Sequence, residues 1–220
     1  MGLIAKKSGG GGDFTPVPPG MHLARCYRVI DLGTQSGTFQ GVVTKKPKVM
    51  FQFEVHGEDD AGNPIVTDKG EPMSISKNFT LSLVEKATLR KDLQTWRGRE
   101  FTETELNGFA LKNVLGVWAM ISVIKAMGND GKEYTNISAI MPVPLAIKRG
   151  GMPQGHNNLK EFSIDEPDME LFSTFSNGLK EKIQKSPEWQ SRGNSSALTP
   201  VIKLTNTGSG FDDMDDSIPF

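Results

Sequence analysis

A set of basic and aromatic residues in the body of the chain has the chemistry to bind a nucleic acid. Sequence-independent binding of a single strand requires cations along the phosphates and flat faces on which the bases stack. The densest cationic group is Lys45-Lys46-Pro47-Lys48, and Tyr134 is the strongest stacking candidate because it shares a strand face with Asn136 and Ser138. The full set of DNA-binding candidates is Lys45, Lys46, Lys48, Lys77, Phe79, Arg90, Lys91, Arg97, Lys125, Lys132 and Tyr134.

Several aromatic and basic residues also have a plain structural explanation. A single lysine is most often a solvated surface charge, and only the adjacency of the charges at 45–48 weakens that explanation. Phe51 and Phe53 alternate with polar residues, so we expect both in the core. Trp96 and Trp118 are expected to be packing residues as well.

The chain ends in a second candidate site, an acidic segment that closes on apolar residues. Its partner-binding candidates are Asp212, Asp213, Asp215, Asp216, Ile218, Pro219 and Phe220. Such an end suits a partner pocket that takes the Phe220 ring while basic residues bind the α-carboxylate and the aspartates. Pro219 limits the entropy lost on docking. A purely solvating tail is the alternative, but exposed apolar side chains such as Ile218 and Phe220 do not help to solvate a tail.

The charge balance restricts where a nucleic acid can bind. The chain has 25 Lys+Arg and 26 Asp+Glu, a formal net charge of −1, which argues against a histone-like polycation. Removing the four tail aspartates leaves 25 − 22 = +3 on the rest of the chain. Any DNA site must therefore be local and lie in the body.

The chain lacks the motifs of the common enzyme classes. It contains no Gly-x-x-x-x-Gly-Lys-Ser/Thr loop, no His-Glu-x-x-His and no Gly-x-Ser-x-Gly. Its single Cys26 cannot form an internal disulfide, which predicts a reducing compartment, and its histidines have no zinc spacing. We therefore predict a protein that is not an enzyme, with no catalytic residue, no metal and no cofactor. A metal-dependent nuclease built from dispersed carboxylates stays open as an alternative.

Period-two alternation predicts one strand directly, and β-rich or apolar runs predict the others. Apolar residues at alternate positions from Val49 to Val55 share one face of a half-buried strand over 48–55. The turn Gly128-Asn129-Asp130-Gly131 predicts a hairpin between two later strands. Those two and the remaining strands are expected over 21–32, 73–81, 117–126 and 132–141.

Helical spacing predicts two further regions. Ser82-Leu83-Val84-Glu85 has the form of a capping box and predicts that a helix begins there. Its apolar stripe runs from Leu89 to Trp96, and Gly98 follows its last turn. A second helical region is expected over 167–185, after a Gly-rich and polar connection.

These elements predict a mainly β fold with helices. Five strands with a helix between the third and the fourth is the order of an OB-fold-like barrel, although other small barrels fit. We expect a flexible Gly- and Pro-rich arm over 1–20 and the binding domain with its C-terminal helical region over 21–189. A flexible linker and the disordered acidic tail are expected over 190–220.

Nothing in the sequence predicts a membrane segment. The longest apolar stretch, Val114–Ile124, is about half of the ~20 residues that a membrane span needs. The first twenty residues have no apolar region of the kind found in signal peptides. We therefore expect a cytoplasmic protein.

The ending of the chain resembles that of a known family. Asp215-Asp216-Ser217-Ile218-Pro219-Phe220 is similar to the acidic tip of bacterial single-stranded DNA-binding proteins, whose aspartate run also precedes Ile-Pro-Phe. In that family the tip docks replication, recombination and repair proteins. Ser217 departs from the pattern, because an acidic residue usually stands next to the isoleucine.

The body resembles a different family, bacteriophage single-stranded DNA-binding proteins with OB-folds, over roughly residues 3–192. The segments that carry the resemblance are Asn78 to Ser82, Leu89 to Leu93, Trp96 to Arg99, Phe101-Thr102 and Tyr134 to Ile137. It implies DNA binding by an OB-type body, without assigning individual contacts.

Together these features predict a phage-encoded protein in the cytoplasm of the infected bacterial host. Its body binds single-stranded DNA without sequence preference, and its tail recruits replication or recombination proteins. The main alternative is an interaction protein whose tail imitates the host protein and captures its partners while the body binds no DNA. A homo-oligomer is compatible with either function.

Overall fold

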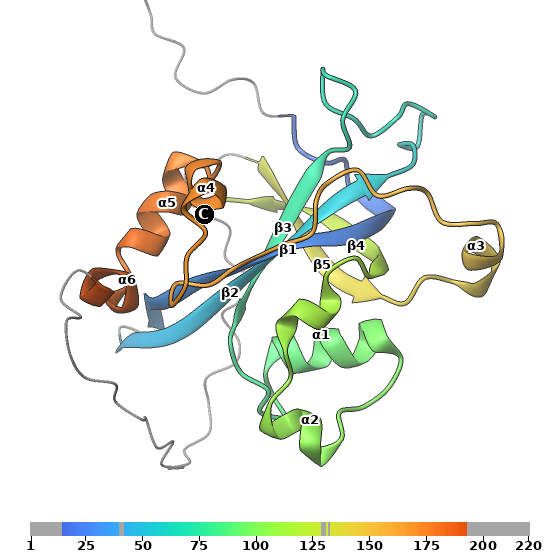
Figure 1. The fold of residues 1–220 in the computed structure, drawn as a ribbon. Coiled ribbons are helices and arrows are strands. Elements are labelled where there is room, and N and C mark those ends of the chain that lie inside the picture. Colours follow the sequence, from blue (N-terminus) through green and yellow to red (C-terminus); the bar gives the residue numbers. More distant parts are fainter. Residues whose placement is uncertain (1–14, 40–41, 129–130, 132, 193–220) are drawn as a thin grey trace, which may run out of the picture.

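The structure is a computed structural model that describes residues 15–39, 42–128, 131 and 133–192. The described part is mainly β, as predicted, with one six-stranded sheet and short helices (Figure 1). The strands are β1 (Gly20–Phe39), β2 (Val42–His56), β3 (Ser74–Thr80), β4 (Trp118–Met127), β5 (Glu133–Met141) and β6 (Lys160–Phe162). The 1–14 part of the predicted arm and the 193–220 part of the predicted linker and tail lie outside the described residues.

The sheet runs in the order β3-β2-β1-β4-β5, with antiparallel neighbours along this path. The long β1 pairs with β2 over most of its length, and on its other edge it pairs first with β4 and then with β6. The short β6 lies parallel to β1 and was not predicted. The path ends at β3 and β5, so the sheet is not closed into the five-stranded barrel that we expected.

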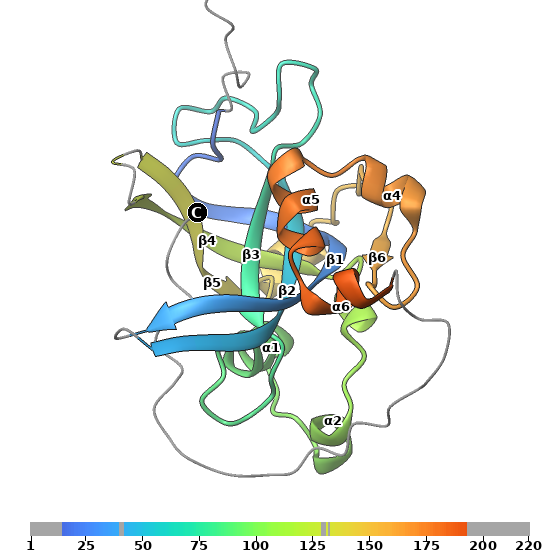
Figure 2. The same ribbon diagram turned by 90° about the vertical axis from the view of Figure 1, so that its left-hand side faces the viewer.

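The C-terminal part of β1 and the N-terminal part of β2 leave the sheet as a two-stranded ribbon (Figure 2). This ribbon, residues 33–38 paired with 43–48, is called the arm from here on and is distinct from the N-terminal arm predicted over 1–20. The ladder continues through Gln35 opposite Lys46 to Thr38 opposite Val43, beyond the part of β1 that pairs with β4 and β6. Register shifts between Cys26 and Arg28 and between Asp31 and Gly33 interrupt this ladder. Such bulges bend and twist a strand pair, which directs the arm away from the body.

The helices are α1 (Thr88–Arg97), α2 (Glu103–Asn107), the 3-10 helix η1 (Leu111–Val114), α3 (Leu145–Arg149), α4 (Met169–Ser173), α5 (Asn177–Gln184) and α6 (Pro187–Ser191). Among the described residues, none of these helices combines the length and apolar character needed to cross a membrane.

The predicted start of the first helix is wrong, whereas its stripe and its end are confirmed. Helix α1 begins at Thr88, because the Ser82 hydroxyl accepts from the amide of Val84 and forms a local turn before the helix. Leu89, Leu93 and Trp96 are buried, and Gly98 ends the helix with a φ of 68°.

The predicted helix over 167–185 is divided into α4 and α5. The Ser176 hydroxyl accepts from the amide of Leu179 and begins α5, while Thr174 ends α4. The break lets Phe172 and Phe175 both pack against the Phe162 ring, with centroids 5.7 and 5.2 Å apart.

Two apolar clusters hold the described residues together. The larger one fills the inside of the sheet and includes Phe51 and Phe53, as predicted, together with Trp96. The smaller one joins α4–α6 to the other side of β1 through Ile30 and Leu32. The C-terminal helices therefore form part of the body and cover part of the sheet's second face.

Candidate nucleic-acid interface

The densest predicted cluster, Lys45, Lys46 and Lys48, lies on β2 where the strand enters the arm. Lys45 is exposed, and Lys46 and Lys48 are partly exposed. The Lys48 ammonium lies 2.9 Å from the hydroxyl of Thr80, its register partner on β3. The pairing therefore places this end of the cluster beside the last residue of β3.

Strand pleating divides β2 and β3 into a core face and a second face. Val49, Phe51 and Phe53 point into the core, so Lys48, Met50 and Gln52 lie on the second face. On β3 the residues opposite them in register are Thr80, Asn78 and Ser76. We call Lys48, Gln52, Ser76, Asn78 and Thr80 the outer face.

The outer face contains buried hydrogen-bond acceptors that nothing in the described structure satisfies. The amide oxygens of Gln52 and Asn78 have no hydrogen-bond partner there. Leaving such a group unpaired costs about 1–3 kcal/mol. Both oxygens have almost no accessible surface, and Met50 on the same face packs against the smaller apolar cluster, so neither oxygen is open to a ligand.

A lysine from the C-terminal helices extends the positive charge of the outer face. Helix α5 lies against the arm, where the Gln35 side-chain amide donates to the Lys182 carbonyl at 3.0 Å. Burial, and then the nearby charge of Lys48, lower the pKa of Lys182. The like charge of Lys48 disfavours the charged form of Lys182.

Phe79 was predicted to contact DNA, and the structure contradicts that role. Its side chain is 0% exposed and packs against the Phe51 ring at a centroid distance of 5.1 Å. It therefore offers no free face to a base. On β3, Ile75, Lys77 and Phe79 point inward, which leaves Ser76 and Asn78 on the outer face.

Lys77 has a structural role in the same inward row. Its ammonium forms a 2.7 Å ion pair with Asp92 of α1 and lies over the Phe79 ring. The same ammonium donates to the carbonyl of Ser138 on β5, at 3.5 Å. Lys77 thus links both ends of the sheet to α1 instead of joining the outer face.

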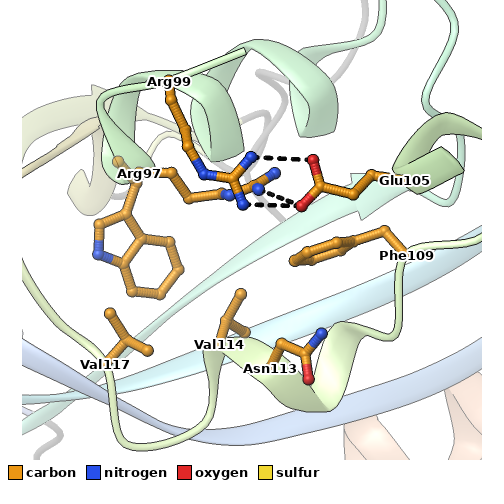
Figure 3. A pocket seen from close by; sticks show the side chains of 8 residues that line it. Arg97, Arg99, Glu105, Phe109, Asn113, Val114 and Val117 are labelled. Atoms are coloured by element: carbon orange, nitrogen blue, oxygen red, sulfur yellow. Dashed lines mark hydrogen bonds and ion pairs between the residues drawn. The ribbon is translucent and has the colours of Figure 1, made fainter. Parts of the chain in front are cut away.

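The three basic candidates on α1 do not join the outer face either. Arg97 pairs with Glu105 (Figure 3) and lies over the rings of Phe101 and Phe109. Arg90 donates to the Leu83 carbonyl at 3.2 Å. Lys91 is exposed on the same helix.

The β4–β5 hairpin holds the remaining candidates. Lys125 forms a 2.8 Å ion pair with Glu133, and both side chains are more than half exposed. Tyr134 is partly exposed and lies opposite Ala126 in the ladder. Lys132 and the tail candidates Asp212, Asp213, Asp215, Asp216, Ile218, Pro219 and Phe220 lie outside the described residues.

Sequence reasoning missed Gln52, Asn78 and Lys182. The alternation that placed Phe51 and Phe53 in the core also placed Gln52 on the opposite face, so its position was available from the pattern. Asn78 and Lys182 had no such signal, because Ser74–Thr80 does not alternate clearly and the packing of α5 on the arm is a tertiary contact.

Within the described ranges, no group of three or more His, Cys, Asp or Glu side chains is arranged to hold a metal ion. No protein-family model matches this chain, and no curated protein is significantly similar to it. The geometry of the outer face is therefore the main basis for a functional proposal.

Proposed function

We propose that the protein binds single-stranded DNA without sequence preference, across the outer face and along the basic side of the arm. The observation that carries this proposal is the row of Lys45, Lys46 and Lys48 on β2 where the strand enters the arm, with Lys182 of α5 near Lys48. Cations along the phosphates are one of the two features that sequence-independent binding of a single strand requires, and Tyr134 is the candidate for the other, a flat face on which a base stacks. A duplex offers no unstacked base to such a face.

The fold supports this proposal by its likeness to an OB-fold. The strand order and the position of α1 between β3 and β4 are those of that fold, in which oligonucleotides bind the face of the second and third strands. Helix α1 also packs against both β3 and β5, the strands that closure would join. We propose an open, OB-type body on these grounds.

The tail supplies the second half of the proposal. Its aspartates and terminal Ile-Pro-Phe suit a basic, apolar pocket on replication or recombination proteins. In this account the protein works in the cytoplasm of a phage-infected bacterium. It covers transient single strands with the body while the tail recruits enzymes.

A fluorescence-anisotropy titration separates this function from its alternatives. Labelled oligo-dT and a duplex of equal length are titrated with the full chain, with and without magnesium. Tight and salt-sensitive binding that favours oligo-dT supports the proposal. No binding to either DNA favours a protein that only captures partners, and magnesium-dependent strand loss favours a nuclease.

Tyr134→Ala is expected to weaken oligo-dT binding by about 1–3 kcal/mol, the range for one stacked base. The ring is partly exposed at the end of the β4–β5 hairpin, so thermal stability is expected to change little. Anisotropy and thermal melting of the same preparation check both parts. A large fall in melting temperature instead would assign the ring to packing.

Deleting Ile218–Phe220 is expected to abolish partner capture while single-strand affinity stays intact or rises slightly. Phe220 supplies the apolar anchor, and the aspartates supply longer-range attraction that cannot replace it. A pull-down from bacterial lysate compares the full and shortened chains.

Neutralising Asp212, Asp213, Asp215 and Asp216 separates the effect of the tail on DNA affinity from its effect on partner binding. We expect higher DNA affinity at low salt, because the aspartates compete with phosphates, and slower association with partners. If the full and shortened chains retain the same partners, the tail is only a solvating appendage.

A further inference from the structure

Helix α6 brings an aromatic ring to the place where β1 enters the arm. The Glu188 carboxylate of α6 accepts from the amide of Thr34, at 2.8 Å, and from its hydroxyl. Gly33 lies directly against Ser186, the residue that begins α6, because a Cβ atom at Gly33 would be 2.5 Å from the Ser186 side chain. Trp189, the next residue after Glu188, is therefore held beside the arm by close packing.

The indole of Trp189 rests on the smaller apolar cluster and is partly exposed. It stacks on the Phe172 ring at a centroid distance of 4.6 Å and an interplanar angle of 21°. The Trp189 amide donates to the Ser186 hydroxyl at 3.3 Å, which fixes the backbone of this turn. A flat ring that packing holds in place and that is partly exposed is suited to stacking with a nucleobase.

The guanidinium of Arg192 lies over the same indole, 5.0 Å from its centroid, on a side chain that is itself exposed. A cation over an exposed aromatic ring changes an equilibrium constant by about two- to fivefold, whereas a stacked nucleobase contributes about five- to 150-fold. A base therefore outcompetes the guanidinium for the ring. The displaced guanidinium is then free to stack on the base or to contact a phosphate.

The lysines of the arm lie on the side of these helices. In the register of the arm, Gly33 lies opposite Lys48 and Gln35 opposite Lys46. Gly33 contacts α6, and the Gln35 side chain donates to α5. Burial, and then the charge of Lys48, lower the pKa of Lys182 on α5, which places Lys48 toward that helix. Lys46 shares its face of β2, because alternate residues of a strand point the same way.

Acidic groups decide which part of a nucleotide fits beside Trp189. Asp165, Glu188 and Arg192 line one hollow of about 430 Å³ at this end of α6. The Asp165 side chain is exposed, and its carboxylate would repel a phosphate. An uncharged base is not repelled, and its N–H groups can donate to a carboxylate oxygen. We therefore expect the phosphates at the lysines and a base at the indole.

We propose that Trp189 and Arg192 form a stacking site for one nucleobase of single-stranded DNA that crosses the arm with its phosphates on Lys46 and Lys48. This inference rests on the proposed function and adds a base site on the C-terminal helices, outside the five strands of the OB-type body. A flat face and cations then occur together at the arm, in addition to Tyr134 on the β4–β5 hairpin. Because every base has a flat face, the site favours single strands without reading their sequence.

The test compares Trp189→Leu with Trp189→Phe in anisotropy titrations with oligo-dT, well below the melting temperature of each protein. Leucine remains apolar but has no flat face, so the affinity is expected to fall at least fivefold. Phenylalanine keeps an aromatic face, and the affinity is expected to stay within threefold of the original. Trp118→Leu makes the same change at another partly exposed tryptophan, on β4, and should leave the affinity unchanged.

Tryptophan fluorescence gives a second readout, which a purely structural role of the ring would not produce. Saturating oligo-dT is expected to quench the emission of the original chain and to leave that of Trp189→Phe nearly unchanged. An abasic oligonucleotide of equal length, which offers phosphates without bases, is expected not to quench either protein.

Equal affinities of Trp189→Leu and the original chain, or equal quenching of the original chain and Trp189→Phe, overturn the stacking site while the proposed function stands. An equal loss of affinity in Trp118→Leu also overturns it, because the effect would then not be specific to Trp189. A much lower melting temperature of Trp189→Leu with unchanged affinity would assign the ring to packing alone. If the original chain does not bind oligo-dT, the proposed function fails and the stacking site fails with it.

Discussion

Reversing the charge at Lys45, Lys46 and Lys48 together is expected to weaken oligo-dT binding about a hundredfold near 0.1 M salt. Each phosphate contact on a single strand contributes roughly 0.7 to the slope of log K against log salt, so losing three contacts lowers the slope by about two. The loss should be nearly equal for all DNA sequences, because phosphates carry no sequence information. Anisotropy titrations at several salt concentrations measure both quantities.

The matched control reverses Lys69, Lys112 and Lys148, which are exposed on other parts of the molecule. This variant has the same net charge as the first, so a general electrostatic effect would appear in both. We expect the control to keep most of the original salt slope. An unchanged slope in the Lys45, Lys46 and Lys48 variant would remove the arm from the DNA site.

Phe79→Ala is expected to lower the free energy of unfolding by about 3–5 kcal/mol, the usual cost of removing a buried phenylalanine. The ring is fully buried beside Phe51, so its loss leaves a cavity in the larger core cluster. Since domains of this kind are stable by only about 5–15 kcal/mol, urea denaturation should show a much lower midpoint.

The DNA affinity of the folded Phe79→Ala protein should stay near that of the original chain at low temperature. Phe79→Leu keeps most of the volume and serves as the milder variant if the alanine form is too unstable to purify. A small stability change combined with a large loss of DNA binding would instead show that Phe79 contacts DNA.

Strand positions could be predicted where one face is continuously apolar. Val49, Phe51, Phe53 and Val55 share one face, and the strand and its core face follow from that pattern. The opposite face has one exception, because Glu54 is also fully buried, where it pairs with Arg25. The hairpin of β4 and β5 and the stripe of α1 are similar cases, because local spacing alone determines which residues are buried.

Features that depend on tertiary contacts could not be predicted in this way. The inward direction of Phe79 depends on the pleat of Ser74–Thr80, in which Lys77 occupies an inward position because Asp92 on α1 pairs with it. The division between α4 and α5 follows from packing around Phe162, a residue on a three-residue strand with no signal of its own.

The residues of the candidate site could also be predicted only where local spacing was sufficient. The lysines at 45–48 were identified by their density, but Lys182 becomes relevant only through the packing of α5 on the arm. Arg97 was chosen for its charge, whereas its contact with Glu105 assigns it to a different part of the molecule.

Lysine acetylation footprinting of the full chain shows which lysines single-stranded DNA covers. The protein is treated with an amine-reactive acetylating reagent, with and without saturating oligo-dT, and each lysine is quantified by mass spectrometry. We predict that oligo-dT slows modification of Lys45, Lys46 and Lys182, while Lys69, Lys112 and Lys148 react as before. Unchanged reactivity on the arm and α5, or protection confined to those three control lysines, would contradict it.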